Sequence, residues 1–457
     1  MSSDRIHFAR RSCWGAAALF LALAGLACAP APPPTPAPGN RPNILLISID
    51  TLRADHLGSY GYARPTSPYL DGLAAEGVRF ADVLTPATST RLAHRAILRG
   101  TLAIAGVEAN PPLAVLLQDS GYATAAIVDG GFMRARFGHD LGFDLYVDDQ
   151  AKAKPGGGRP VADQRGGGFA AVLPRATTWL EQQEEEPWFL FLHTYDVHCP
   201  YEPPAEDAAL FTDSLAAMAD VAGLCGQSGL REMNLDDQGL ALIRALYDGG
   251  IHHADRLLGE FMAHAGGAGW LENTIIAVIS DHGESLGENE WIGHNRLFRE
   301  QLQVPWIMAG PGVPRGRAVG GPAHLVDLVP TVLDYAGLPL PKGIVGRSLR
   351  SVADGSSTLE KDRLRVSETQ RARALIREPW MVITNKAGDQ VLQVVRRDGR
   401  PMSGEADPPG SRPVEDLLAA WDALAKRMDL DVTNLDEADI PAGGEVREEL
   451  RTLGYVD

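Results

Sequence analysis

The chain has 457 residues, of which 45% are hydrophobic, and its formal net charge at pH 7 is −17. This length supplies enough apolar material for one large core and a smaller satellite unit. Such an acidic surface argues against nucleic acid or an anionic membrane as a partner. An anionic substrate would therefore need positive charge at the site itself, most simply from a metal ion.

The first residues have the pattern of an export signal over 1–28. Arginines precede an apolar run from Trp14 to Ala27, which is too short for an ordinary membrane-spanning helix. The run ends at Cys28, as in a bacterial lipoprotein whose cysteine carries the lipid, although simple signal cleavage fits the same residues. The Pro- and Ala-rich residues 29–41 then predict an extended tether. We expect an exported protein of the periplasm or cell envelope, which meets the membrane only through this signal or a lipid anchor.

Four cysteines occur, and two of them, Cys13 and Cys28, belong to the signal region. In an oxidising compartment, the remaining pair, Cys199 and Cys225, could form a disulfide across one insertion. Two unpaired, partly buried thiols are the alternative.

The first predicted element of the mature chain is a buried strand over 43–50, which ends in the carboxylate of Asp50. The later elements follow from apolar periodicity and from glycine and proline positions. They are strands at 123–128, 188–192, 274–279, 380–384 and 390–395, helices at 68–77, 247–261, 413–428 and 444–454, and a glycine-rich surface loop at 152–168.

The apolar run 274–279 is a second buried strand that stops at charged or polar side chains, here Asp281 and His282. In open α/β sheets, ligands bind beyond the carboxyl ends of the strands. Two strands far apart in sequence can therefore bring Asp50, Asp281 and His282 together, and carboxylates with an imidazole can hold a divalent cation. The alternative is a polar turn that merely follows a strand.

Five ordered segments of the chain resemble the sulfatase family of the alkaline phosphatase superfamily, in its bacterial branch with a DTLRADHLG-YGY opening. They are residues 43–62, 191–201, 274–284, 304–312 and 327–331. The resemblance implies an α/β fold, a three-layer sandwich of the alkaline-phosphatase/sulfatase kind, over residues 42–350. A small C-terminal α+β unit with terminal helices is expected over residues 351–457.

In this family, the segment matching residues 85–100 holds the nucleophile at a helix N-terminus, where the dipole favours an anion. Sulfatases place a cysteine or serine there, which is converted to formylglycine within C/S-x-P/A-x-R. Here the position is Thr90, with Leu92 and His94 in place of the proline and arginine. Formylglycine is not expected. The threonine resembles the lipoteichoic-acid-synthase and nucleotide-phosphodiesterase branches, in which a threonine hydroxyl attacks phosphorus; the alternative is that it merely caps a helix.

The resemblance implies one divalent metal ion held by Asp50, Thr90, Asp281 and His282. Thr51 stands where sulfatases usually have a second aspartate, and His282 where many have asparagine. Two carboxylates, a hydroxyl and an imidazole favour Mn²⁺ or Zn²⁺, with Ca²⁺ as the alternative.

For the anionic ester substrate, the resemblance implies that His94 and His198 hold the ester oxygens and that His294 protonates the leaving group. A lysine that many sulfatases carry after the strand at 123–128 is replaced by Asp129 and two glycines. Three functions therefore compete: hydrolysis of a sulfate or phosphate ester, transfer of an envelope phospho-group to an acceptor alcohol, and binding by a catalytically degenerate sulfatase-like protein. Nothing in the sequence indicates an oligomeric state.

Overall fold

The computed structural model describes residues 41–105, 110–148, 167–183, 187–213, 228–229, 235–386, 390–396 and 412–428. The predicted signal and nearly all of the tether, Cys225, most of the 152–168 loop and the helix predicted at 444–454 lie outside the described residues. Among the helices that are described, none is both long enough and apolar enough to cross a membrane.

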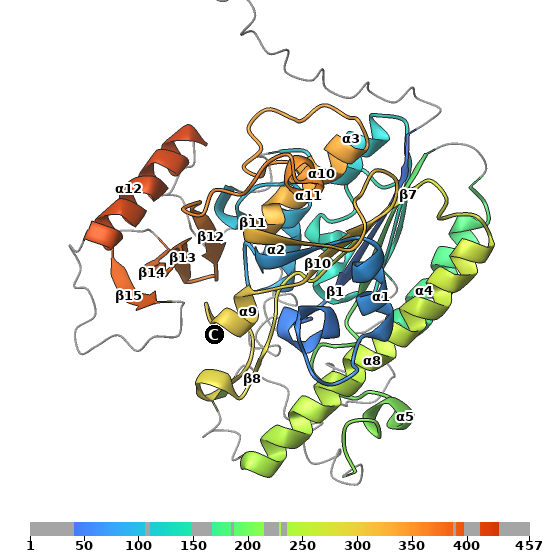
Figure 1. Cartoon of the computed structure of the whole chain (residues 1–457), viewed down its shortest axis with the longest axis horizontal. Coiled ribbons are helices and arrows are strands. Elements are labelled where there is room, and N and C mark those ends of the chain that lie inside the picture. The colour runs from blue at the N-terminus through green and yellow to red at the C-terminus, as the bar shows by residue number, and fades with distance from the viewer. Residues whose placement is uncertain are drawn as a thin grey trace, which may run out of the picture.

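A mixed sheet forms the centre of the molecule (Figure 1). It has eight strands in the order β11-β2-β10-β7-β1-β5-β3-β4. Its strands are β1 (Asn43–Ile49), β2 (Val78–Leu84), β3 (Ala123–Val128), β4 (Leu145–Val147), β5 (Trp188–Thr194), β7 (Thr274–Ile279), β10 (Trp306–Ala309) and β11 (Arg317–His324). β1 lies between β5 and β7 and runs parallel to both. β10 is antiparallel to both its neighbours, β7 and β2. The carboxyl ends of β5, β1 and β7 therefore meet at one edge of the sheet.

Helices cover both faces of this sheet (Figure 1). The bounds are α1 (Pro68–Glu76), α4 (Gly168–Leu180) and α8 (Asp237–Gly267) on one face, and α2 (Thr90–Ile97), α3 (Leu113–Gln118), α10 (Leu328–Tyr335) and α11 (Arg350–Asp354) on the other. Side chains of β1 alternate between the two cores: Ile44 and Leu46 pack on the α2 side, whereas Leu45 and Ile47 pack on the α8 side. Burial on both faces explains why the strand is a continuous apolar run. The predicted three-layer α/β sandwich is confirmed.

The smaller unit is a four-stranded antiparallel sheet with one helix packed on it. Its elements are β12 (Arg365–Glu368), β13 (Ala372–Arg377), β14 (Trp380–Asn385), β15 (Val391–Arg396) and α12 (Arg412–Arg427). Leu417 and Trp421 on α12 pack against Leu375 and Val382 of the sheet. The predicted C-terminal α+β unit is therefore present. α11, which spans the boundary predicted at residue 351, packs into the core of the main unit.

Short elements complete the described part of the chain. They are α5 (Ala205–Ala208), α9 (Arg299–Leu302), the three-stranded sheet of β6 (Ser228–Gly229), β9 (Trp291–Gly293) and β8 (Ser285–Leu286), and 3-10 helices at Ala54–His56, Gly58–Tyr60, Ala103–Ala105, Gly131–Met133, Ala135–Phe137, Glu288–Glu290 and Leu325–Asp327.

Two elements are longer than the sequence predicted. α8 has 31 residues and contains the expected helix 247–261; the side chain of its N-cap residue, Asp236, accepts a hydrogen bond from the Gly239 amide. Internal glycines, which disfavour helix, obscured its ends in the sequence. β5 continues past Leu192 because His193 and Thr194 stay in register with Ser48 and Ile49 of β1. This extension brings His193 to the end of the sheet where Asp50 lies.

Candidate metal centre

The ends of β1 and β7 bring three candidate metal ligands together. Asp50 follows β1, and Asp281 and His282 follow β7; all three side chains are fully buried. One ligand atom from each lies within 4.8 Å of the others. The parallel pairing of the two strands produces this group, as the sequence predicted. Whether these residues bind a metal remains a prediction.

The turn after β1 aims Asp50 at Asp281. Thr51 has φ 57°, a left-handed conformation that a β-branched residue rarely adopts. Its amide donates a hydrogen bond to Asp281 Oδ1 at 3.3 Å. The hydroxyl of Tyr247, on α8, donates to the Thr51 carbonyl at 2.7 Å and accepts from the Arg53 amide at 2.9 Å. The unfavourable backbone conformation is thus held by contacts from two other segments, and no sequence pattern marked Tyr247 for this role.

Thr90 begins α2 with its side chain turned toward Asp50. Its hydroxyl donates to Asp50 Oδ2 at 3.0 Å, and both side chains are fully buried. The side chain of the N-cap residue, Ser89, makes no capping hydrogen bond within the described part of the chain. A simple capping role for this threonine-serine segment therefore has little support, and the helix start presents a hydroxyl to the candidate metal ligands.

His94 lies on α2 one turn after Thr90, and its side chain is fully buried. Its Nδ1–H donates to the Thr90 carbonyl at 2.9 Å, and its Nε2 accepts from the Ser48 hydroxyl at 2.9 Å. Burial of the ring lowers the pKa of His94 to about 4. Both ring nitrogens are thus engaged inside the protein, and the predicted contact of His94 with the ester oxygens stays a prediction.

His193, to which the sequence analysis assigned no role, lies beside Asp50. Its Nε2 is 3.3 Å from Asp50 Oδ2, and burial lowers the pKa of the ring to about 4. In the sheet, His193 pairs with Ser48, two residues before Asp50. Alternate residues of a strand share a face, so strand register was the signal that could have identified this histidine.

His198 and His294 come together next to His282. Their Nε2 atoms are 3.3 Å apart, and the His294 and His282 ring centroids are 4.5 Å apart. The Nδ1–H of His294 donates to the Thr88 carbonyl at 3.0 Å. A carboxylate oxygen of Glu284 lies within 4.8 Å of ring nitrogens of both histidines. The structure therefore joins the two predicted substrate histidines and adds an acid that the sequence analysis did not identify.

The donor atoms of Asp50, Asp281 and His282 suit a divalent cation. Burial first, and then the charge of Asp50, raises the pKa of Asp281 to about 7. The Nδ1–H of His282 donates to the Gly283 carbonyl at 3.0 Å, which leaves a lone pair on Nε2. Within the described residues, Asp281 Oδ2 and His282 Nε2 are buried without a hydrogen bond. Two close carboxylates and a directed imidazole lone pair fit a bound metal ion.

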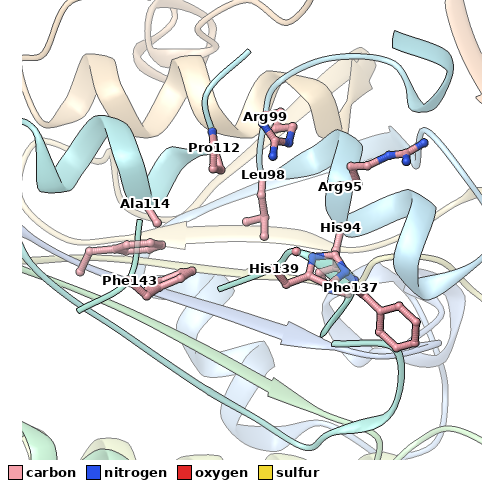
Figure 2. A pocket seen from close by; sticks show the side chains of 11 residues that line it. His94, Arg95, Leu98, Arg99, Pro112, Ala114, Phe137, His139 and Phe143 are labelled. Atoms are coloured by element: carbon pink, nitrogen blue, oxygen red, sulfur yellow. The ribbon is translucent and has the colours of Figure 1, made fainter. Parts of the chain in front are cut away.

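A separate pocket opens behind α2 (Figure 2). Its wall comes from α2, α3, Phe189 of β5 and the segment 137–143, and it includes His94 and His139. Its lining does not include Asp50, Thr90, Asp281 or His282, so we do not assign it to the candidate centre.

The sequence and the fold were compared with known proteins. A family model described as Sulfatase matches residues 42–338. An arylsulfatase from Clostridium perfringens is 25% identical over 387 residues, which cover 70% of this chain and 80% of that protein. Arylsulfatase K from Danio rerio is 40% identical over 107 residues, which cover 23% of this chain and 20% of the relative. The chain thus aligns with only about a fifth of the arylsulfatase K length.

Solved structures share the fold. A phosphonate monoester hydrolase from Agrobacterium radiobacter superposes with a TM-score of 0.67 at 19% identity, covering 89% of this chain and 99% of that one. A protein solved in complex with its substrate, D-glucosamine-2-N,6-O-disulfate, superposes with a TM-score of 0.65 at 17% identity, covering 87% and 99%. Sulfatase family enzymes are metal-dependent, and candidate ligand groups are present here. The chain therefore belongs to the sulfatase family, and it is a sulfatase-like ester hydrolase.

Proposed function

We propose that this protein is a metal-dependent hydrolase of sulfate or phosphate esters that uses the Thr90 hydroxyl as its nucleophile in place of formylglycine. The observation that carries the proposal is the 3.0 Å hydrogen bond from Thr90 Oγ1 to Asp50 Oδ2, inside a group that includes Asp281 and His282. Threonine cannot be converted to formylglycine. If residue 90 supplies the nucleophile, as its position in the family implies, the threonine hydroxyl itself must attack the ester.

Asp50, Thr90, Asp281 and His282 would hold one divalent ion. Two carboxylates, a hydroxyl and an imidazole favour Mn²⁺ or Zn²⁺ over Ca²⁺, which prefers a set made of oxygen atoms only. When bound, such an ion lowers the pKa of a neighbouring hydroxyl and offsets the negative charge of the ester group.

The protein's own residues prepare the nucleophile. Asp50 Oδ2 accepts the hydrogen bond of the Thr90 hydroxyl and so orients its oxygen and lies ready to accept its proton. Thr90 begins α2, and the dipole of a helix N-terminus favours an anionic ester group there. Attack of Thr90 Oγ on sulfur or phosphorus would form an ester to threonine and release the alcohol, which takes up a proton. Water would then hydrolyse that ester and restore the hydroxyl.

The test is an assay of protein produced in a host without formylglycine-generating enzyme. Purified protein would be assayed with four esters, each in the presence of Mn²⁺, Zn²⁺ or Ca²⁺. The esters are p-nitrophenyl sulfate, p-nitrophenyl phosphate, bis-p-nitrophenyl phosphate and a phenyl ester of a phosphonate. We expect turnover of at least one ester, with residue 90 found as unmodified threonine by mass spectrometry. An adduct between the phospho-group and an added acceptor alcohol would instead identify a transferase. No turnover of any ester would contradict the proposal and favour a binding protein.

We also propose that the protein is exported and anchored at the cell envelope through Cys28. The apolar run that ends at Cys28 supports this location, as does the disulfide that Cys199 forms, because disulfides persist in oxidising compartments. Wild-type protein should partition with membranes, and Cys28→Ser should release it or leave the signal uncleaved. Soluble wild-type protein beginning at Ala29 or Pro30 would establish ordinary secretion instead.

A further inference from the structure

The second group of residues, His198, Glu284 and His294, has the composition of a metal site. Two imidazoles and one carboxylate form a three-residue donor set that binds zinc in enzymes and leaves a fourth position open. Glu284 and His294 are buried, and His198 is partly buried. The three residues come from separate segments: the loop after β5, the loop after β7 and the residue following β9. Such convergence is not the result of one polar turn.

Backbone carbonyls fix the orientation of both rings. The Nδ1–H of His198 donates to the Cys199 carbonyl, and the Nδ1–H of His294 donates to the Thr88 carbonyl. In each neutral ring, Nε2 therefore carries a lone pair, and the two Nε2 atoms face each other. A ring nitrogen bound to a backbone carbonyl, with the other nitrogen directed at a shared point, is the usual arrangement of metal-binding histidines.

The distance between the two nitrogens fits a shared metal ion. Nitrogen ligands that lie about 2.0–2.1 Å from a tetrahedral zinc are about 3.3–3.4 Å from each other. The observed separation of 3.3 Å matches this geometry. We propose that His198, Glu284 and His294 bind a second divalent cation, zinc by its donor set, beside the ion held by Asp50, Asp281 and His282.

The second cation would supply charge that this chain otherwise lacks at the site. Asp129 and two glycines follow β3, where many relatives carry a lysine for the substrate anion. The three acids Asp50, Asp281 and Glu284 are buried within the two groups of candidate ligands, and bound cations would offset their negative charge. A second dication would attract an anionic ester group to the His198 side. This last consequence rests on the proposed function, whereas the metal site itself does not.

The experiment counts zinc ions per chain in the full-length mature protein. Each sample is equilibrated with excess zinc, cleared of unbound metal and measured by inductively coupled plasma mass spectrometry, with protein quantified by amino-acid analysis. We expect two equivalents in the wild type and one equivalent in Glu284→Gln and in His198→Gln. His252→Gln is the matched control, because His252 is paired to Asp207 and belongs to neither group. It should keep two equivalents.

A second pair of samples separates this site from the first. Asp281→Asn should keep one equivalent, and the double variant Asp281→Asn/Glu284→Gln should keep none. Circular dichroism verifies the fold of each variant, and cobalt titration of the wild type gives a readout without mutation, since two successive equivalents should each change the visible absorption. One equivalent in the wild type, or an unchanged count in Glu284→Gln and His198→Gln, would overturn the second site. Neither result depends on turnover, so the proposed hydrolase activity can stand or fall separately.

Discussion

Oδ2 of Asp50 accepts a hydrogen bond from the Thr90 hydroxyl at 3.0 Å, although the two residues are 40 positions apart in sequence. The same oxygen lies 3.3 Å from Nε2 of His193. One carboxylate oxygen therefore connects the end of β1, the start of α2 and the end of β5. A threonine held in this way by a buried acid has a defined direction of attack, which leads to the first prediction.

Replacing the proposed nucleophile should remove the covalent step. Thr90→Ala should lower kcat by about three to six powers of ten, because loss of a nucleophile costs roughly that much in comparable enzymes. Thr90→Ser keeps a hydroxyl and should retain part of the activity. The control is Thr101→Ala, which removes a buried threonine hydroxyl that has no hydrogen-bond partner within the described residues. It should leave kcat unchanged. Full activity of Thr90→Ala would point to an activated water molecule instead.

The carboxylates at the ends of β1 and β7 should be required for metal binding. Asp50→Asn and Asp281→Asn should each lose one equivalent of bound metal, because an amide has no negative charge to offset the ion. Asp255→Asn is the matched control, since this buried acid on α8 accepts hydrogen bonds from the Tyr69 and Leu70 amides instead. Metal content per chain is the measurement. Undiminished content in both site variants would reject the assignment.

Tyr247 should affect the metal centre without touching it. Tyr247→Phe removes the hydroxyl that bridges the Thr51 carbonyl and the Arg53 amide, so the unfavourable turn at Thr51 loses support. We expect metal affinity to fall about 10-fold or more, as for outer partners of other metal sites. Chelator competition gives this affinity. Tyr335→Phe removes a buried hydroxyl that lacks a partner in the described structure and should change nothing. Equal affinity of Tyr247→Phe and wild type would contradict the proposed support.

The grouping of the candidate metal ligands could be predicted from sequence because strand ends are visible in the sequence itself. Asp50 and Asp281 each follow an apolar run, and parallel strands place such ends at one edge of the sheet. The residues that support them could not be predicted in this way. His193 depends on its register with Ser48, and Tyr247 reaches Thr51 from a helix almost 200 positions later. Such contacts depend on three-dimensional packing, and no local pattern encodes them.

The orientation of the His94 ring shows what a sequence pattern does not determine. The residue stands in the nucleophile helix, where the sequence suggested contact with the ester. The structure turns its ring inward, between Ser48 and the Thr90 carbonyl. A helix start fixes where a side chain begins, but packing between α2 and the sheet decides where the ring points.

The last prediction concerns stability against pH and uses His324, a buried ring far from the metal ligands in sequence. Its Nε2–H donates to the Val366 carbonyl at 2.9 Å, and its Nδ1 accepts from the Val326 amide at 3.3 Å. The second bond requires the neutral ring, because protonation of Nδ1 removes the lone pair that accepts from Val326. Burial, followed by the charge of Arg363, lowers the pKa of His324 to about 3. The unfolded chain, with a pKa of about 6.5, therefore binds more protons than the folded chain between these two values.

The stabilising effect of neutral His324 is thus complete above about pH 6.5 and is lost as pH falls toward 3. At pH 5, the loss is about 2 kcal/mol, at about 1.4 kcal/mol per pH unit. We expect His324→Gln to be less stable than wild type at pH 8, yet to lose about 2 kcal/mol less between pH 8 and pH 5. Urea unfolding at both pH values, with metal removed from all samples, gives these free energies. His264→Gln, which changes an exposed histidine on α8, should keep the wild-type pH dependence. If His324→Gln loses as much stability as wild type between pH 8 and pH 5, the buried neutral ring does not control the pH dependence of stability.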